Sequence, residues 1–178
     1  AEQFNEKADI RGYVRHIVQK DGLIVSRAVD KNARTPFEMY YEYAEKIDAI
    51  PPHRILALRR GEAKKALKVH LDADHAKLIE TLARRVFTSD HPFSGFLKST
   101  LNDACKRLIF PAIEREIRAA LNEKADAQAI DVFSQNLRQL LMQPPVRGKV
   151  IMGIDPGYRT GCKVAVIDER GTYLDGTT

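Results

Sequence analysis

Residues 150–168 have the sequence VIMGIDPGYRTGCKVAVID, and this stretch decides the fold prediction. Its first part, Val150–Ile154, is too short for a helix and rich in β-branched residues, so it predicts a buried strand that leads to Asp155. A proline and a glycine then stop the strand, and the apolar run Lys163–Ile167 predicts an antiparallel partner across a tight turn. The pattern therefore places a carboxylate at the end of a strand, beside a turn.

A domain boundary is predicted just before this stretch. Two prolines and a glycine within Pro144–Gly148 separate helix-period from strand-period sequence. We expect a helical region over residues 1–144 and the beginning of a second domain over residues 145–178, with a third short strand at Thr172–Leu174. Three strands with an open edge and no covering helix do not make a stable domain. We therefore expect the chain to be a piece of a longer protein, cut at both ends.

The helical region is predicted to contain a small two-stranded element. The segment Leu23–Val29 contains several β-branched residues, which favour a strand. Its natural partner is Leu67–Leu71, in which apolar and polar residues alternate with period two. Helices are expected over Glu2–Lys20, over the aromatic segment Phe37–Lys46, and from a proline pair at residue 51 to about Arg60, where Gly61 would end the last one.

From Ala73 onward the chain is predicted to be helical almost throughout, with apolar residues at helical spacing. Pro111 should kink the long helix or begin a new one. The fold class is therefore mainly α (α+β). The predicted core stripes are Leu78, Ile79, Leu82 and Val86; Leu97, Leu101, Ala104, Leu108, Ala112 and Ile117; and Ile130, Phe133, Leu137 and Leu141.

Composition excludes some functions and favours others. No apolar run approaches the ~20 residues that span a bilayer, and the charged first ten residues do not resemble a signal peptide. The two cysteines, Cys105 and Cys162, lie far apart in sequence, so we expect a reducing compartment, the cytosol, and no membrane. A net charge of +5 and a pI near 9.2 favour a polyanionic partner.

Basic residues concentrate between Pro51 and His70, where six are basic and only Glu62 is acidic. Such clusters bind phosphates, and nearby tyrosines could stack on bases. A solvated helix end explains the same pattern, since cations favour a helix C-terminus. Arg54 is set apart, because it could pair with Glu42 or Glu45. The candidate nucleic-acid-binding residues are Arg59, Arg60, Lys64, Lys65 and Lys68.

Asp155 is the candidate catalytic residue and metal ligand. Two-metal phosphodiester enzymes need several converging carboxylates, and an aspartate at the end of a strand would supply one of them. The alternative is a turn-initiating aspartate that caps Gly157 or Tyr158. The histidines and cysteines show no zinc spacing, and the sequence has no glycine-rich phosphate loop.

The segment around Asp155 resembles a known domain. Residues 153–161, GIDPGYRTG, are similar to the first catalytic strand of the ribonuclease-H-like fold and especially to the opening of Holliday-junction resolvases. The longer run Gly153–Asp168 resembles the start of the YqgF-type domain of the Tex family of transcription accessory proteins. Tyr40–Glu45 followed by Ile50–Glu62 is similar to the helical domain that precedes YqgF in that family, although Pro52 stands where the family often has serine.

This resemblance implies a modular nucleic-acid binder. Helix-hairpin-helix elements and an OB-fold RNA-binding domain would lie outside this chain, as would the other acidic residues of a ribonuclease-H-like site. We therefore expect RNA and/or DNA, and the transcription machinery, as partners of the full-length protein. No cofactor is expected for this chain, and it should not catalyse a reaction alone, whereas the full-length protein could use Mg²⁺.

Three hypotheses remain open. The favoured one is a sequence-tolerant nucleic-acid-binding module. The second is a metal-dependent nuclease or resolvase with Asp155 as its first ligand, and a ribonuclease-H-like module kept only for binding lies between the two. The third is a protein-docking scaffold, which an exposed apolar patch would favour. An actin-like ATPase is disfavoured, because Tyr158 and Arg159 are bulky where small hydroxyl residues would meet phosphate.

Overall fold

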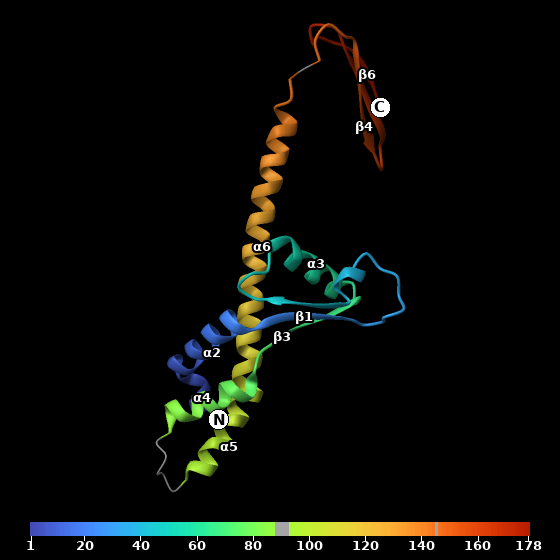
Figure 1. The fold of residues 1–178 in the computed structure, drawn as a ribbon. Helices are drawn as coiled ribbons and strands as arrows, with labels where there is room; N and C mark the ends of the chain where they lie inside the picture. The colour runs from blue at the N-terminus through green and yellow to red at the C-terminus, as the bar shows by residue number, and fades with distance from the viewer. Residues whose placement is uncertain (88–92, 145) are drawn as a thin grey trace. The chain divides into compact units, whose positions relative to one another are not determined.

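The computed structural model describes residues 1–87, 93–144 and 146–178, which form two compact units, Ala1–Phe133 and Ser134–Thr178. Figure 1 shows the order of the elements along the chain. The first unit is mainly helical around a small sheet, and the second contains an antiparallel meander. The predicted mainly α class with a second, strand-containing region is therefore confirmed. Within the described residues, no helix is long and apolar enough to cross a membrane.

The sheet of the first unit has three antiparallel strands in the order β2-β1-β3. The predicted pair is confirmed as β1 (Leu23–Ala28) and β3 (Leu67–Asp72), with Val25 opposite His70. The third strand, β2 (Glu42–Lys46), was not predicted, and it pairs with the other edge of β1.

The predicted aromatic helix over residues 37–46 is wrong. A short 3₁₀ turn, η1 (Glu38–Tyr40), precedes β2, and exposure alternates with period two along β2. Tyr43 and Glu45 are half-buried on one face, and the Tyr43 ring packs edge-on against Tyr40 with centroids 5.2 Å apart. The free edge of β1 and this packing stabilise a strand where clustered tyrosines suggested a helix.

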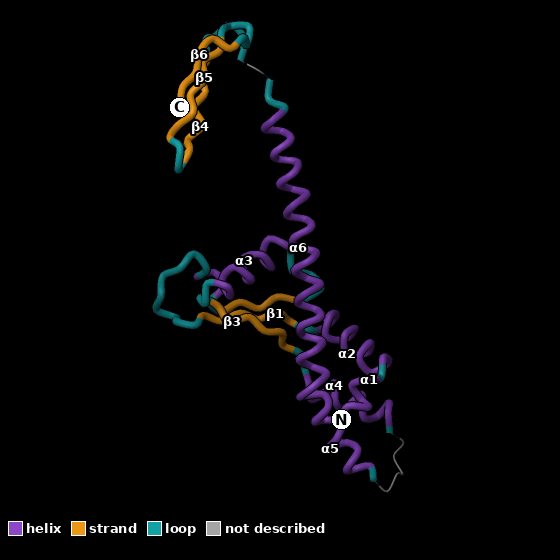
Figure 2. Tube along the Cα trace, turned by 180° about the vertical axis from the view of Figure 1, so that it is seen from behind, coloured by secondary structure: helices purple, strands orange, loops and turns teal. Residues whose placement is uncertain are grey.

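Helix α3 (Pro52–Ala63) packs on the inner face of the sheet (Figure 2). Ile55 and Leu58 of this helix belong to the same buried core as Ile24 of β1 and Val69 of β3. The helix was expected to end at Gly61 but continues past it, because Gly61 is a packing position. A Cβ there would lie 2.5 Å from Cδ1 of Leu67, whose side chain is buried.

The remaining helices of the first unit are α1 (Glu2–Glu6), α2 (Ala8–Asp21), α4 (His75–Val86) and α5 (Ser94–Ala104). The single helix expected at the start is broken at Lys7, whose backbone is extended. A five-residue π-helical segment, η2 (Cys105–Ile109), separates α5 from α6 (Phe110–Leu141). This change of helix type lies where Pro111 was expected to interrupt the helix, because proline lacks the amide hydrogen that an α-helix needs.

The first two predicted stripes contribute to the core, through Leu78, Leu82, Leu101, Ala104 and Ile117. The third stripe was expected to be buried and is exposed. Its residues Ile130, Phe133, Leu137 and Leu141 are 66%, 65%, 40% and 73% exposed, respectively. The buried core extends along α6 only as far as Ala125, so helical periodicity correctly indicated an apolar face but not its burial.

The second unit contains β4 (Ile151–Gly157), β5 (Gly161–Ile167) and β6 (Tyr173–Thr177), antiparallel and in that order. All three predicted strands are confirmed, and Asp155 lies directly opposite Lys163. The first strand was expected to be buried and is exposed, with Met152 and Ile154 at 62% and 61%, because the described residues of the second unit place no element over it. A register shift between Val166 and Ile167 lies where β6 pairs with β5.

Candidate functional site

A turn rich in lysine connects α3 to β3. The Lys65 amide donates to the Glu62 carbonyl at 2.9 Å, and the Ala66 amide donates to the Gly61 carbonyl at 2.9 Å. These two bonds form a Schellman motif, in which the residue after the cap adopts the left-handed conformation that usually requires glycine. Here that residue is Lys65, with φ of 57°. The turn thus presents two exposed lysines, Lys64 and Lys65, on a backbone whose amide groups donate hydrogen bonds to the last turn of α3.

Arg54 is occupied within the fold. Its Nη1 donates to both carboxylate oxygens of Glu45, at 2.8 and 3.0 Å, so the prediction of a pair with Glu42 or Glu45 is confirmed for Glu45. Tyr43 also donates its hydroxyl to Glu45. The Tyr43 hydroxyl and Arg54 together lower the pKa of Glu45, while burial and the Glu45 carboxylate raise the pKa of Tyr43 to about 12. The Arg54–Glu45 ion pair therefore links α3 to β2.

Arg59 is also paired. Its two terminal nitrogens donate to the two oxygens of Asp126 on α6, both at 2.7 Å. This bidentate geometry holds the pKa of Asp126 below its ordinary value. Arg59 would have to leave Asp126 before it could contact a phosphate with the same nitrogens.

The other four predicted residues, Arg60, Lys64, Lys65 and Lys68, are exposed. Within residues 1–87, 93–144 and 146–178 none of the four has an ion-pair partner. The acidic residue nearest in sequence, Glu62, is bound by Arg118 of α6. The pairing of Glu62 thus leaves the lysine-rich turn without local compensation of its charge.

Arg27 of β1 joins this group through strand register. It lies directly opposite Lys68 of β3, and both side chains are exposed. Like charges in directly opposite positions destabilise a sheet. On the other side of Arg27 lies Glu42, whose carboxylate also binds Lys31 at 2.7 Å. Sequence reasoning missed Arg27, because its proximity to Lys68 depends on the pairing of distant strands. We define the basic surface as Arg27, Arg60, Lys64, Lys65 and Lys68.

Asp155 is exposed on β4, and Lys163 of β5 lies opposite it. Asp175 pairs in register with Val166 and so projects from the other face of the meander, because directly opposite residues share a face. Asp168 accepts the amide hydrogens of Arg170 and Thr172, both at 2.8 Å, and these bonds hold its pKa below the ordinary value. The three aspartates of the meander are therefore not brought together.

The described residues offer a Mg²⁺ ion one candidate carboxylate, that of Asp155. Asp155 offers one carboxylate facing a lysine, and the described part of the chain contains no group of three acidic, histidine or cysteine side chains arranged for a metal. Magnesium sites use one or two carboxylates together with substrate phosphates and waters. The alternative of a capping aspartate is also without support, because no hydrogen bond joins Asp155 to Gly157 or Tyr158 among the described residues. The metal-ligand role of Asp155 stays a prediction.

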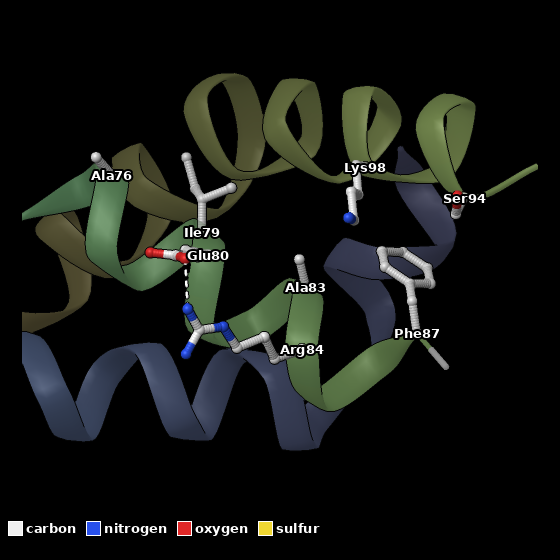
Figure 3. A pocket seen from close by; sticks show the side chains of 8 residues that line it. All are labelled: Ala76, Ile79, Glu80, Ala83, Arg84, Phe87, Ser94 and Lys98. Carbon is white, nitrogen blue, oxygen red and sulfur yellow. Dashed lines mark hydrogen bonds and ion pairs between the residues drawn. The ribbon is translucent and has the colours of Figure 1, made fainter. Parts of the chain in front are cut away.

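A groove of about 700 Å³ lies between α4 and α5, away from all the predicted site residues (Figure 3). Its floor is apolar, Glu80 and Arg84 form an ion pair of 2.5 Å at its rim, and Lys98 extends into it. The lining residues are Ala76, Ile79, Glu80, Ala83, Arg84, Phe87, Ser94 and Lys98. Among these described lining residues, Ser94 is the only hydroxyl side chain, and no hydrogen bond joins it to a base.

Two family models match the chain in consecutive segments. A model described as Tex central region-like matches residues 1–133, and one described as Tex protein YqgF-like domain matches residues 149–178. The resemblance stated from the sequence is thus confirmed in both segments.

Curated relatives match nearly the whole chain but are much longer. Uncharacterized protein YdcI of Bacillus subtilis is 48% identical over 98% of this chain and 25% of its own length. Protein tex of Bordetella pertussis is 34% identical over 100% of this chain and 24% of its own length, and S1 RNA-binding domain-containing protein 1 of Homo sapiens is 34% identical over 98% and 19%. The chain spans about a quarter or less of these relatives, and it belongs to the Tex family.

Proposed function

We propose that this chain provides a phosphate-binding surface to a nucleic-acid-binding protein that acts with the transcription machinery. The single observation that carries the proposal is the basic surface, five exposed cations from α3, the following turn and two adjacent strands. Glu62, the acid nearest in sequence to three of them, is bound by Arg118, and only Arg27 has an acid, Glu42, opposite it in the strand register of the described sheet. Family membership supports a nucleic-acid-associated role, since relatives are named transcriptional accessory protein Tex and S1 RNA-binding domain-containing protein 1. A nucleic-acid ligand is consistent with a protein that acts in the cytosol.

Two features of the basic surface support a role in binding. Arg27 and Lys68 lie opposite each other on adjacent strands, an arrangement that a bound phosphate would stabilise. Lys65 holds a left-handed conformation that glycine would adopt at lower cost. Structural strain of this kind is common at functional sites. Because phosphate contacts carry no sequence information, binding through this surface should tolerate any sequence.

The test compares two triple variants of the full-length protein with equal net charge. K64Q/K65Q/K68Q removes three cations of the basic surface, and K20Q/K77Q/K124Q removes three exposed lysines elsewhere in the first unit. Binding of fluorescein-labelled RNA and DNA, single- and double-stranded, is measured by anisotropy from 50 to 200 mM salt. The first variant should lose affinity and lower the slope of log K against log salt by about 2 to 3. Equal slopes in both variants, or no binding by the wild-type protein, would overturn the proposal.

The docking hypothesis predicted an exposed apolar patch, and the stripe on α6 is such a patch. The described residues do not show what covers it, so docking of protein partners by this stripe stays a prediction. The nuclease hypothesis needs further carboxylates beside Asp155, and the described residues contain no group of three possible metal ligands.

A further inference from the structure

The tip of the β4–β5 hairpin presents an aromatic ring and a cation that the fold does not use. Tyr158 is fully exposed, at 107% of its reference area, and Arg159 beside it is exposed as well. Neither side chain has a hydrogen-bond or ion-pair partner within residues 146–178. Turns favour glycine, asparagine, aspartate and serine, so the turn itself has no need of a tyrosine and an arginine.

The hairpin holds these two side chains on a tight support. Gly157 and Gly161 face each other across the turn, with three residues between them. A Cβ on Gly157 would lie 2.5 Å from the Gly161 carbonyl oxygen, and Gly161 has φ of +84°. Both positions therefore require glycine, and the loop between them is short and sharply defined. The bulky residues lie where they project outward and make no contribution to a core.

The charge around the tip is positive. Within residues 157–163, Arg159 and Lys163 are basic and none is acidic, and the carboxylate nearest in sequence, Asp155, lies opposite Lys163 in register. An aromatic face next to a free guanidinium matches the two parts of one nucleotide, because the ring can stack on a base while the cation binds the adjacent phosphate. A base can offer its face only where it is unpaired and unstacked, so this chemistry favours a single strand over a duplex.

We propose that the β4–β5 hairpin tip is a contact for single-stranded nucleic acid, in which Tyr158 stacks on an unpaired base and Arg159 binds a neighbouring phosphate. The proposal rests on the proposed nucleic-acid-binding function and adds a second point of contact, with different chemistry, in the second unit. Stacking is independent of base identity, so the contact preserves sequence tolerance.

The direct test is photo-cross-linking of the full-length protein to single-stranded RNA that carries 5-iodouridine, followed by trypsin digestion and mass spectrometry. Trypsin releases residues 150–159 as one peptide, in which Tyr158 is the only aromatic residue. We expect an adduct on this peptide in the wild type and in the matched control Y173A, which removes an exposed tyrosine of β6. The adduct should be absent from Y158A.

Affinity measurements separate the two roles. With a fluorescein-labelled single strand, Y158A should weaken binding by about 5- to 150-fold, as loss of one stacked base does, while Y158F should stay within about 2-fold of wild type. R159Q should lower the salt slope by about 0.7, and Y158A should leave it unchanged.

The possible failures are distinguishable. If the wild-type protein binds no nucleic acid, the proposed function fails and the tip contact fails with it. If the wild type binds but Y158A binds equally well and no adduct maps to residues 150–159, only the tip proposal is overturned, and a protein partner becomes the occupant to seek. Equal losses for Y158F and Y158A would overturn stacking in favour of a hydroxyl contact, and equal losses on duplex and single strand would overturn the requirement for an unpaired base.

Discussion

Replacement of Lys65 by glycine should stabilise the chain while weakening its basic surface. Lys65 has φ of 57° within the turn that ends α3. A left-handed conformation costs a residue with a side chain about 1 to 2 kcal/mol, and glycine avoids this cost. Glycine in turn loses more chain entropy on folding, about 0.5 to 1 kcal/mol relative to alanine. The difference leaves a net stabilisation of about 0.5 to 1 kcal/mol for K65G.

The neighbouring lysine provides a matched control. Lys64 has φ of −83°, so glycine relieves no strain there, and K64G should destabilise the chain by about 0.5 to 1 kcal/mol. Both variants lose one exposed positive charge. Thermal unfolding of the 178-residue chain, followed by circular dichroism at 222 nm, should show the midpoint of K65G raised by about 1 to 4 °C and that of K64G lowered by a similar amount. A K65G midpoint equal to or below that of K64G would refute the reasoning.

Three further predictions follow from specific contacts. Tyr43 and Arg54 depress the folded-state pKa of Glu45, so the stability that this carboxylate contributes is present above its unfolded pKa and is lost as the pH falls through its folded pKa. When the thermal unfolding midpoint is measured against pH, E45Q should therefore show a smaller decline than the wild type below about pH 4.3. An unchanged profile would contradict this. G61A should lower stability by about 1 to 2 kcal/mol in urea unfolding, since a clash with buried Leu67 outweighs the gain in helix propensity; a stabilised variant would show that Leu67 can move. In calorimetry, the 178-residue chain and its D155N variant should give the same heat of Mg²⁺ addition, because Asp155 is a single carboxylate. Mg²⁺ binding by the wild type that is lost in D155N would contradict this expectation.

Apolar patterns predicted the type of most elements but not always their burial, and a strand without such a pattern was missed. β3 alternates apolar and polar residues, β1 begins with a run of apolar residues, and the structure pairs the two strands as expected. β2 places the half-buried Tyr43 and Glu45 on its inner face, so its alternation is not one of hydrophobicity. The free edge of β1 and the packing of Tyr43 on Tyr40 explain its conformation. Local sequence carries no information about that edge.

Charge partners were predictable only over short separations. The Arg54 pair with Glu45 spans nine residues and was expected. The partner of Arg59, Asp126, lies 67 residues away on α6, and no pattern near Arg59 indicates it. Likewise, Arg27 joins the basic surface through strand register. Counting the cations of one sequence segment therefore includes some, such as Arg59, that are already paired. It also omits others, such as Arg27, that strand pairing places beside the segment.

The two proposed contacts divide the chemistry of nucleic-acid binding between the units. The tyrosines of residues 40–43 are less available for stacking than Tyr158, because Tyr40 is buried and Tyr41 and Tyr43 are half-buried. The basic surface thus offers cations without a fully exposed ring, which suits phosphates on either a single strand or a duplex. The hairpin tip offers a free ring with one cation, which suits an unpaired base. A preference for single strands should therefore depend on the second unit, whereas salt dependence should come mainly from the first.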